Sequence, residues 1–345
     1  MTLLTPCCRV CGPQRDGSPR NKLFKCTLCQ AVMYCGSEHQ SSDFAVHKTA
    51  DAATNWWRKK PAPAMARPRE SPFKTSVGQF YGILGTRAYI RAKLELVRAL
   101  SAVDTYSATV AALNEALDSL RLCRSDNLGI RGVIPALMLM LGKYQEAYDF
   151  IKWWSTCDVD DDNPYDWQDM SSPYLDIHGA NMYESVKPFE EEVVVFPLAA
   201  LTYLKMKLST AVEDAFLALD VVQEKSLPMP AALAIQSLLM PTYDGKIKTK
   251  TELKALRKVL EKQQKKLFKS TLRFNEHYWK SLADPQPFLD MSKPQYYSPG
   301  SREEIKLWAL QNHYLWREGL DYVEYQTITF PYVMYHLPQG GPRPT

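Results

Sequence analysis

The sequence predicts a small metal-stabilised finger at the N-terminus and, behind it, a mainly α-helical body. Six of the eight cysteines and two of the six histidines lie in the first 51 residues, a density typical of a metal site. From about residue 76 the apolar residues recur with a helical period and not with strand alternation. A chain of 345 residues has room for one such finger and one helical domain.

The finger is predicted from the spacing of its cysteines and histidines. A Cys-x2-Cys pair bends the backbone so that two sulfurs reach one ion, and the chain has two such pairs. A closed tetrahedral zinc site takes four sulfur or imidazole ligands, so two sites need eight. Seven candidates follow in chain order: Cys8, Cys11, Cys26, Cys29, Cys35, His39 and His47.

Zinc is favoured over disulfides as the stabilising link. A segment of about 50 residues is too small to fold on an apolar core alone. No basic region followed by a long apolar stretch precedes the cysteines, so an oxidising secretory route is not expected. The histidines placed among the cysteines also favour metal. Two zinc ions are therefore the predicted cofactors.

The cysteine and histidine pattern resembles the MYND-type zinc finger over residues 8–51. The resemblance rests on the order of the pairs, on Tyr34 before the fifth ligand, on Gln40 directly after the sixth, and on His47 followed by Lys48. In that family the ligands interleave between two ions, and the resemblance implies two ligand sets. The first set is Cys8, Cys11, Cys35 and His39, and the second is Cys26, Cys29, His47 and Asp51.

Two ligand positions depart from the family, which usually has cysteine where this chain has His39 and Asp51. Histidine for cysteine is a routine exchange at structural zinc. Aspartate offers a hard carboxylate in place of a soft thiolate, so the second site is expected to be the weaker one. The alternative is that Asp51 is a solvated residue beyond a short helix. Cys7, next to Cys8, is interpreted as a spare thiol.

The resemblance also implies a partner surface. Some MYND fingers receive short proline-rich peptides beside a glutamine after the sixth ligand and an aromatic residue four positions later, here Gln40 and Phe44. The aromatic residue of such fingers is usually tryptophan. Phenylalanine keeps the apolar platform for a proline ring but lacks the indole N–H donor. The alternative is that Phe44 packs inside the finger's own core.

The chain is expected to divide into four segments. The finger is assigned to residues 1–54 and a basic, proline-rich linker to residues 55–75. Four prolines between positions 61 and 72 resist a helix and favour an extended tether. The helical domain is assigned to residues 76–330, and residues 331–345 are predicted to be a flexible tail.

The helical patterns of the body come in pairs. The first pair is predicted at residues 79–103 and 106–123. The second joins residues 133–141 to residues 144–154 through Gly142, which permits a tight turn. The Gly-x-Tyr-x-Glu-Ala sequence of this turn resembles the middle of a tetratricopeptide (TPR) repeat.

A third pair is predicted at residues 196–208 and 210–222. A long loop from residue 158 to residue 192 separates it from the second pair, which is too far for regular repeats. An irregular TPR-like array is therefore expected, with a plain helical bundle as the alternative. Further on, residues 246–269 read as a basic amphipathic helix and residues 302–317 as another helix.

The sequence favours a protein without catalytic activity. Some MYND proteins are SET-domain lysine methyltransferases that end in a TPR-like region, but the passage from finger to helices leaves no room for their β-rich catalytic domain. Asn312 and His313, the pair that such an enzyme needs in a loop, fall inside an expected helix. A phosphate loop, a nucleophile elbow and an open catalytic zinc site are not evident. A methyltransferase remains the enzymatic alternative.

The expected function is that of an adaptor. The finger recruits a protein or peptide, with a proline-rich peptide as the implied example, and the helical body holds a second partner. Transcriptional or chromatin regulation follows by family analogy only. The alternative is a nucleic-acid-associated regulator that uses the linker and residues 246–269, although a net charge of +4 is small for one. No stretch suits a membrane span, and the nucleus or cytoplasm is expected.

Overall fold

The computed structural model of the chain describes residues 4–12, 22–58, 71–158, 164–189, 195–226, 228, 249–284, 286–292, 294 and 296–316. Within helices, the side chains of residues 46, 49–58, 195–197 and 308–314 lie outside this set. The chain divides into two compact units, Thr2–Met182 and Tyr183–Thr345. The first unit holds the finger and the first helices of the body, and the second holds the remaining helices.

The described residues of the finger form one small hairpin and one helix. Strand β1 (Phe24–Lys25) pairs antiparallel with β2 (Met33–Tyr34), so that Phe24 lies opposite Tyr34. Helix α1 (Ser37–Arg58) follows directly. Buried residues of the β1–β2 loop and of β2 form the apolar part of the finger core, namely Ala31, Val32 and Tyr34.

The prediction of an extended linker from residue 55 is wrong at both ends of that segment. Helix α1 continues to Arg58, because no proline or glycine interrupts the chain before residue 61. A short helix, α2 (Pro72–Thr75), forms at the other end, where Pro72 occupies the first turn and its missing N–H costs nothing. Residues 59–70 lie outside the described residues, as do residues 317–345 with the predicted tail.

The first predicted pair of body helices is present, although its first α-helix begins at Leu84 and not at residue 79. After a short 3-10 turn (Phe80–Gly82), helix α3 (Leu84–Ser101) is followed by α4 (Tyr106–Leu122). Ala108, Ala112 and Ala116 are fully buried at four-residue spacing on α4, which lets the two helices approach closely. Lys93 of α3 forms ion pairs with two acidic residues of α4, Glu115 and Asp118.

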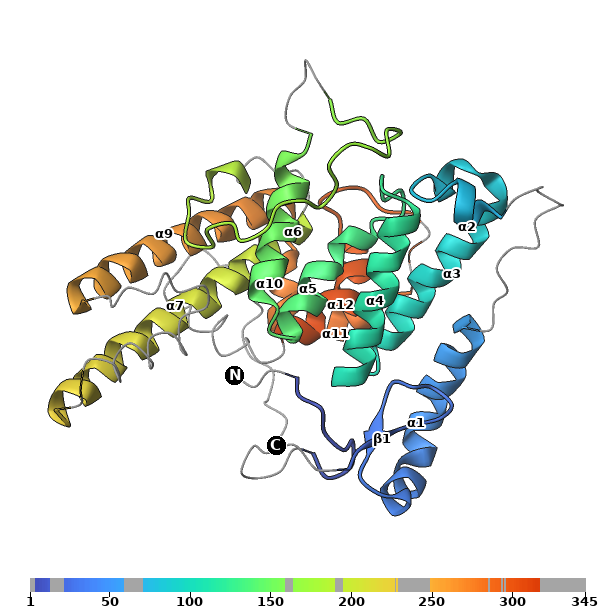
Figure 1. The fold of residues 1–345 in the computed structure, drawn as a ribbon, viewed down its shortest axis with the longest axis horizontal. Helices are drawn as coiled ribbons and strands as arrows, with labels where there is room; N and C mark the ends of the chain where they lie inside the picture. The colour runs from blue at the N-terminus through green and yellow to red at the C-terminus, as the bar shows by residue number, and fades with distance from the viewer. Residues whose placement is uncertain are drawn as a thin grey trace. The chain divides into compact units, whose positions relative to one another are not determined.

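The second pair also forms, and its turn depends on one glycine. After a second 3-10 turn (Ile130–Gly132), helix α5 (Ile134–Met140) and helix α6 (Tyr144–Thr156) are joined through Gly142, whose φ of 74° is the left-handed conformation that glycine tolerates. Ala147 on α6 is fully buried at the helix contact. Consecutive helices pack on each other from α3 to α6 (Figure 1).

The prediction of a third helix pair is wrong. One continuous helix, α7 (Val195–Glu224), spans both of its halves. The expected break at residues 209–210 contains only serine and threonine, which do not interrupt a helix, and Ala211 and Val212 continue the buried face. The body is thus mainly helical, but this segment is not a helical hairpin of TPR type.

The basic helix is α9 (Lys250–Phe274), and it packs antiparallel along α7 (Figure 1). Three cross-links fix the register: Lys250 with Asp220, Arg257 with Glu213, and Gln264 with the carbonyl oxygen of Lys205. Leu253, Leu260 and Leu267 are fully buried at seven-residue spacing. Thr249 and Glu252 form a capping box that starts the helix.

Three more helices of the second unit lie in the described part of the chain. They are α10 (Tyr278–Ala283), α11 (Gln286–Leu289) and α12 (Arg302–Trp316). Trp279 of α10 stacks on Phe268 of α9 and meets Trp316 of α12 edge to face. None of the helices in the described part of the chain is both long and apolar enough to cross a lipid bilayer.

Candidate metal centre

Each Cys-x2-Cys pair of the finger is held in the same type of turn. The residue after the second cysteine adopts a left-handed backbone, Gly12 with φ of 67° and Gln30 with φ of 59°. Its amide donates to the carbonyl oxygen of the first cysteine, Cys8 at 2.8 Å and Cys26 at 3.0 Å. This turn points both sulfurs of a pair toward one place, as a metal requires.

The first cluster brings together Cys8, Cys11, Cys35 and His39, whose ligand atoms all lie within 4.8 Å of one another. Cys35 directly follows β2, and His39 lies in the first turn of α1. The fold therefore joins an N-terminal pair to residues about 25 positions further along the chain. This is the ligand set that the MYND resemblance implies for the first ion.

The second cluster contains Cys26, Cys29 and His47, all buried, with ligand atoms again within 4.8 Å. His39 and His47 are eight residues apart on α1, which is about 12 Å along a helix axis. One helix therefore supplies a ligand to each cluster, and the clusters interleave along the chain. The side chain of Asp51 lies outside the described residues, so its role as the eighth ligand stays a prediction.

The distances within the clusters fit zinc. At the tetrahedral angle, zinc–sulfur bonds of about 2.3 Å hold two sulfurs about 3.8 Å apart, and a sulfur and a nitrogen ligand about 3.5 Å apart. The Cys11 and Cys35 sulfurs are 3.7 Å apart, and the Cys8 sulfur is 3.4 Å from Nδ1 of His39. In the second cluster the Cys29 sulfur is 3.4 Å from Nε2 of His47.

The surroundings of Cys8 favour its thiolate, which is the form that binds metal. Burial raises the pKa of the Cys8 thiol, but hydrogen bonds from the backbone of Cys11, Cys35 and Val10 outweigh it and lower the pKa to about 6. In the second cluster, the amide of Ala31 donates to the Cys29 sulfur at 3.3 Å.

Cys7 differs from these ligands. It belongs to neither cluster, and burial together with the charge of Cys8 raises its pKa. The interpretation of Cys7 as a spare thiol is consistent with this placement.

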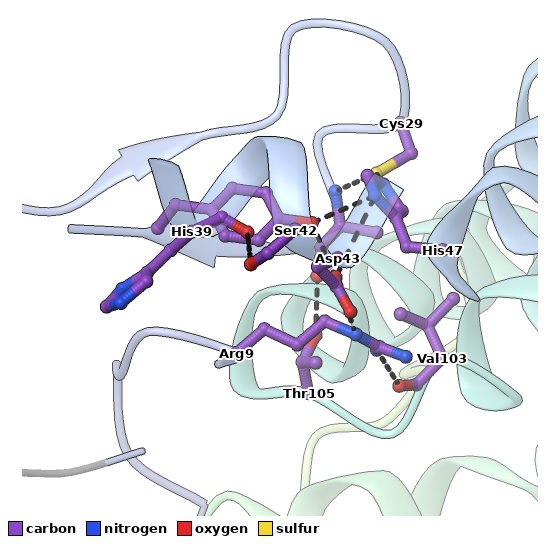
Figure 2. A network of polar contacts seen from close by, with 10 residues as sticks. Arg9, Cys29, His39, Ser42, Asp43, His47, Val103 and Thr105 are labelled. Carbon is purple, nitrogen blue, oxygen red and sulfur yellow. Dashed lines mark hydrogen bonds and ion pairs between the residues drawn. The ribbon is translucent and has the colours of Figure 1, made fainter. Parts of the chain in front are cut away.

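The histidine of the second cluster is held by residues to which the sequence analysis assigned no such role. Nδ1 of His47 lies 2.8 Å from the Tyr34 hydroxyl, which donates to Oδ2 of Asp43 at 2.7 Å. Asp43 in turn pairs with Nε of Arg9 at 3.0 Å (Figure 2). Burial, and then the hydrogen bond to Asp43, raise the pKa of Tyr34, so its hydroxyl stays protonated. The Asp43–His47 spacing of four residues on one helix was the available signal.

Gln40 and Phe44, the residues predicted to bind a peptide, lie one turn apart on α1. Gln40 is half-buried, and Phe44 remains 46% exposed. Phe44 is therefore not enclosed in the finger core, and its role in binding a peptide stays a prediction.

Comparison with known families agrees with this geometry. A family model for the MYND finger matches residues 8–50. The N-terminal segment of the chain is therefore a MYND finger, and its two Cys/His clusters are zinc sites. A bound zinc ion cross-links the turns and α1 at each site, a structural role. Comparisons of the chain with curated proteins and with solved structures found no match.

Proposed function

We propose that this protein is a non-catalytic adaptor whose finger recruits a protein or peptide partner through Gln40 and Phe44. The MYND finger is a zinc-binding module for protein interaction. The observation that carries the proposal is the exposure of Phe44 on the metal-anchored helix α1. We further propose that the helical body binds a second partner and that the protein acts in the nucleus or cytoplasm.

The chemistry of these two residues fits a proline-rich peptide. An exposed aromatic ring offers an apolar face to a proline ring, and the amide of Gln40 offers a donor and an acceptor to the peptide backbone. Three further large apolar side chains of the finger are exposed: Val10, Phe24 and Leu28. Exposed apolar groups in so small a module support a surface for partners.

The test is a titration of the full-length protein with proline-rich peptides chosen from an array, read by fluorescence anisotropy. Replacing Phe44 with Ala is expected to weaken the best peptide at least tenfold, and replacing it with Trp is expected to strengthen it by restoring an indole N–H. The control is Leu84→Ala, which removes a side chain that is 76% exposed outside the finger. Equal binding by wild type and Phe44→Ala at unchanged zinc content would refute the proposal.

A second candidate function rests on the lysines of α9. Those at positions 254, 258, 262, 265 and 269 are exposed and follow one side of the helix over about 22 Å. Such a stripe suits the phosphates of a nucleic acid, whose binding weakens as salt is added. The double variant Lys258→Glu/Lys262→Glu is expected to abolish binding to duplex or single-stranded probes, and Lys225→Glu is the control. Absence of any binding at low salt would eliminate this function.

A further inference from the structure

The second zinc site of the finger is connected to the helical body by a chain of polar contacts (Figure 2). The chain begins at His47, whose Nε2 faces the Cys29 sulfur and whose Nδ1 contacts the Tyr34 hydroxyl. It passes through Asp43 to Arg9, and Nη1 of Arg9 donates to the carbonyl oxygen of Val103 at 3.3 Å. Val103 lies between α3 and α4, 94 residues from Arg9.

The directions of these hydrogen bonds depend on a ligand role for His47. A nitrogen that binds metal presents its lone pair, so Nε2 of His47 carries no proton and Nδ1 carries the one that remains. Nδ1–H therefore donates to the Tyr34 oxygen, which leaves the Tyr34 O–H to donate to Asp43. When zinc is bound, each hydrogen bond between His47, Tyr34 and Asp43 therefore has one fixed direction. Without a metal, either ring nitrogen of His47 can carry the proton, so these directions are not fixed.

A second polar path leads from the same site to the same turn. The Ala31 amide donates to the Cys29 sulfur, and the hydroxyl of Thr105 donates to the carbonyl oxygen of Ala31. Thr105 is also the N-cap of α4, where its side-chain oxygen accepts from the amide of Ala108. The two paths thus reach the α3–α4 turn two residues apart, at Val103 and Thr105.

Burial strengthens both paths. Tyr34 and Ala31 are fully buried, His47 is nearly so, and the Asp43 side chain is 11% exposed. Solvent screens polar contacts in such surroundings less than it screens pairs on the surface. The loss of a hydrogen-bond partner therefore costs more free energy for a buried group than for an exposed one. Helix α1 also packs against α3, so the finger and the body meet over more than these polar atoms.

We propose that zinc binding at the second site is coupled to docking of the finger on the α3–α4 turn, with Arg9, Asp43 and Thr105 as the positioning residues. Zinc at Cys26, Cys29 and His47 fixes the finger on the body, and loss of this ion releases the turn. Because coupling is reciprocal, a change on the body side alone lowers the affinity of the finger for zinc. This inference does not depend on peptide binding at Phe44.

The body-side experiment uses Thr105→Asp in the full-length protein. Aspartate is a good N-cap and keeps the acceptor for the Ala108 amide, but its carboxylate has no proton to donate to Ala31. Zinc release to a chromogenic chelator is followed in time, and the phase belonging to the second site is identified as the one missing in Cys29→Ser. This phase is expected to be about tenfold faster in Thr105→Asp, while Thr105→Ser, which keeps the hydroxyl, matches wild type.

A finger-side variant tests the other path independently. Arg9→Gln breaks the link between Asp43 and Val103, and it is matched by Arg98→Gln, which breaks the Arg98–Glu95 pair in the same unit. The two arginines are similarly exposed, at 26% and 24%. Only Arg9→Gln is expected to speed zinc release from the second site.

The reciprocal readout is hydrogen exchange at the α3–α4 turn. Chelation of zinc from wild type is expected to raise exchange in a peptide covering residues 102–110, with peptides from α5 and α6 as internal references. Unchanged zinc release in both Thr105→Asp and Arg9→Gln would overturn the coupling. Unchanged exchange at the turn after complete zinc removal would do the same.

Discussion

Removing one oxygen atom from Tyr34 is predicted to weaken the second zinc site without altering any ligand. Tyr34→Phe keeps the buried ring but takes away the acceptor of the His47 Nδ1–H and the donor to Asp43. A buried donor left without a partner costs about 1–3 kcal/mol. Mutation of a residue that hydrogen-bonds a metal-binding histidine typically lowers metal affinity about 10- to 100-fold, which corresponds to about 1.4–2.8 kcal/mol. The two estimates agree.

The assay is competition for zinc with a chelator of known affinity, read as two zinc equivalents per chain. The equivalent assigned to the second site is expected to be lost at a 10- to 100-fold lower chelator concentration in Tyr34→Phe. Tyr148→Phe, a fully buried tyrosine of α6 in the same unit, controls for the loss of a buried hydroxyl. A Tyr34→Phe protein with wild-type affinity for both ions would refute the assigned role of Tyr34.

Three further predictions concern the finger and the second unit. Cys26→Ser is expected to lower the zinc content by one ion or more and unfold the finger while leaving most of the helical circular dichroism, because the body helices have their own core. Leu260→Ala is expected to destabilise the fully buried seam between α7 and α9 by about 2–5 kcal/mol, measured by urea unfolding. The third concerns Lys205 of α7, which donates to the carbonyl oxygen of Glu184 and whose pKa burial lowers to about 7, against a smaller opposing effect of Glu184. Between pH 7 and about 10 the unfolded chain therefore binds more protons at this lysine than the native protein does. The free energy of unfolding of wild type is expected to rise with pH over this range relative to that of Lys205→Met. Parallel pH profiles of the two free energies would contradict this.

The zinc ligands were predictable from the sequence because the chemistry of the site fixes their spacing. Cys8, Cys11, Cys26 and Cys29 each belong to a pair separated by two residues, and the turn that such a pair needs involves only neighbouring residues. The interleaving of the two sets came from the family resemblance and not from the spacing. The clusters observed in the structure have the same interleaving.

Predictions about the helical body succeeded where a single residue type ends a helix. Gly142 ends one helix and begins the next, as its left-handed backbone requires. The break expected near residue 209 does not occur. Serine and threonine at this place do not by themselves end a helix, and packing against α9 favours the continuous helix α7. Small residues such as Ala211 indicate close helix contact but do not by themselves indicate a turn.

The docking contacts were not predictable for a different reason. Arg9 meets Val103 across 94 residues and Thr105 meets Ala31 across 74, and no periodicity relates such positions. Tyr34 was noted only as part of the MYND resemblance. Its contact with His47 depends on the strand β2 packing beside α1, which only the folded finger provides.

Asp43 and Phe44 are neighbours on α1, so their side chains leave the helix about 100° apart. Asp43 turns inward to Tyr34 and Arg9, while Phe44 stays exposed. The contacts that couple the second zinc site to the body therefore also fix the rotation of α1 and the direction in which Phe44 faces. A peptide held at Phe44 is expected to raise the affinity of the second site for zinc and so to slow zinc release. Zinc is then expected to raise the affinity for the peptide by the same factor as the peptide raises the affinity for zinc. If a peptide binds through Phe44 but leaves zinc release unchanged, α1 keeps this rotation without the ion. The partner surface and the zinc-dependent docking would then be separate properties of the finger.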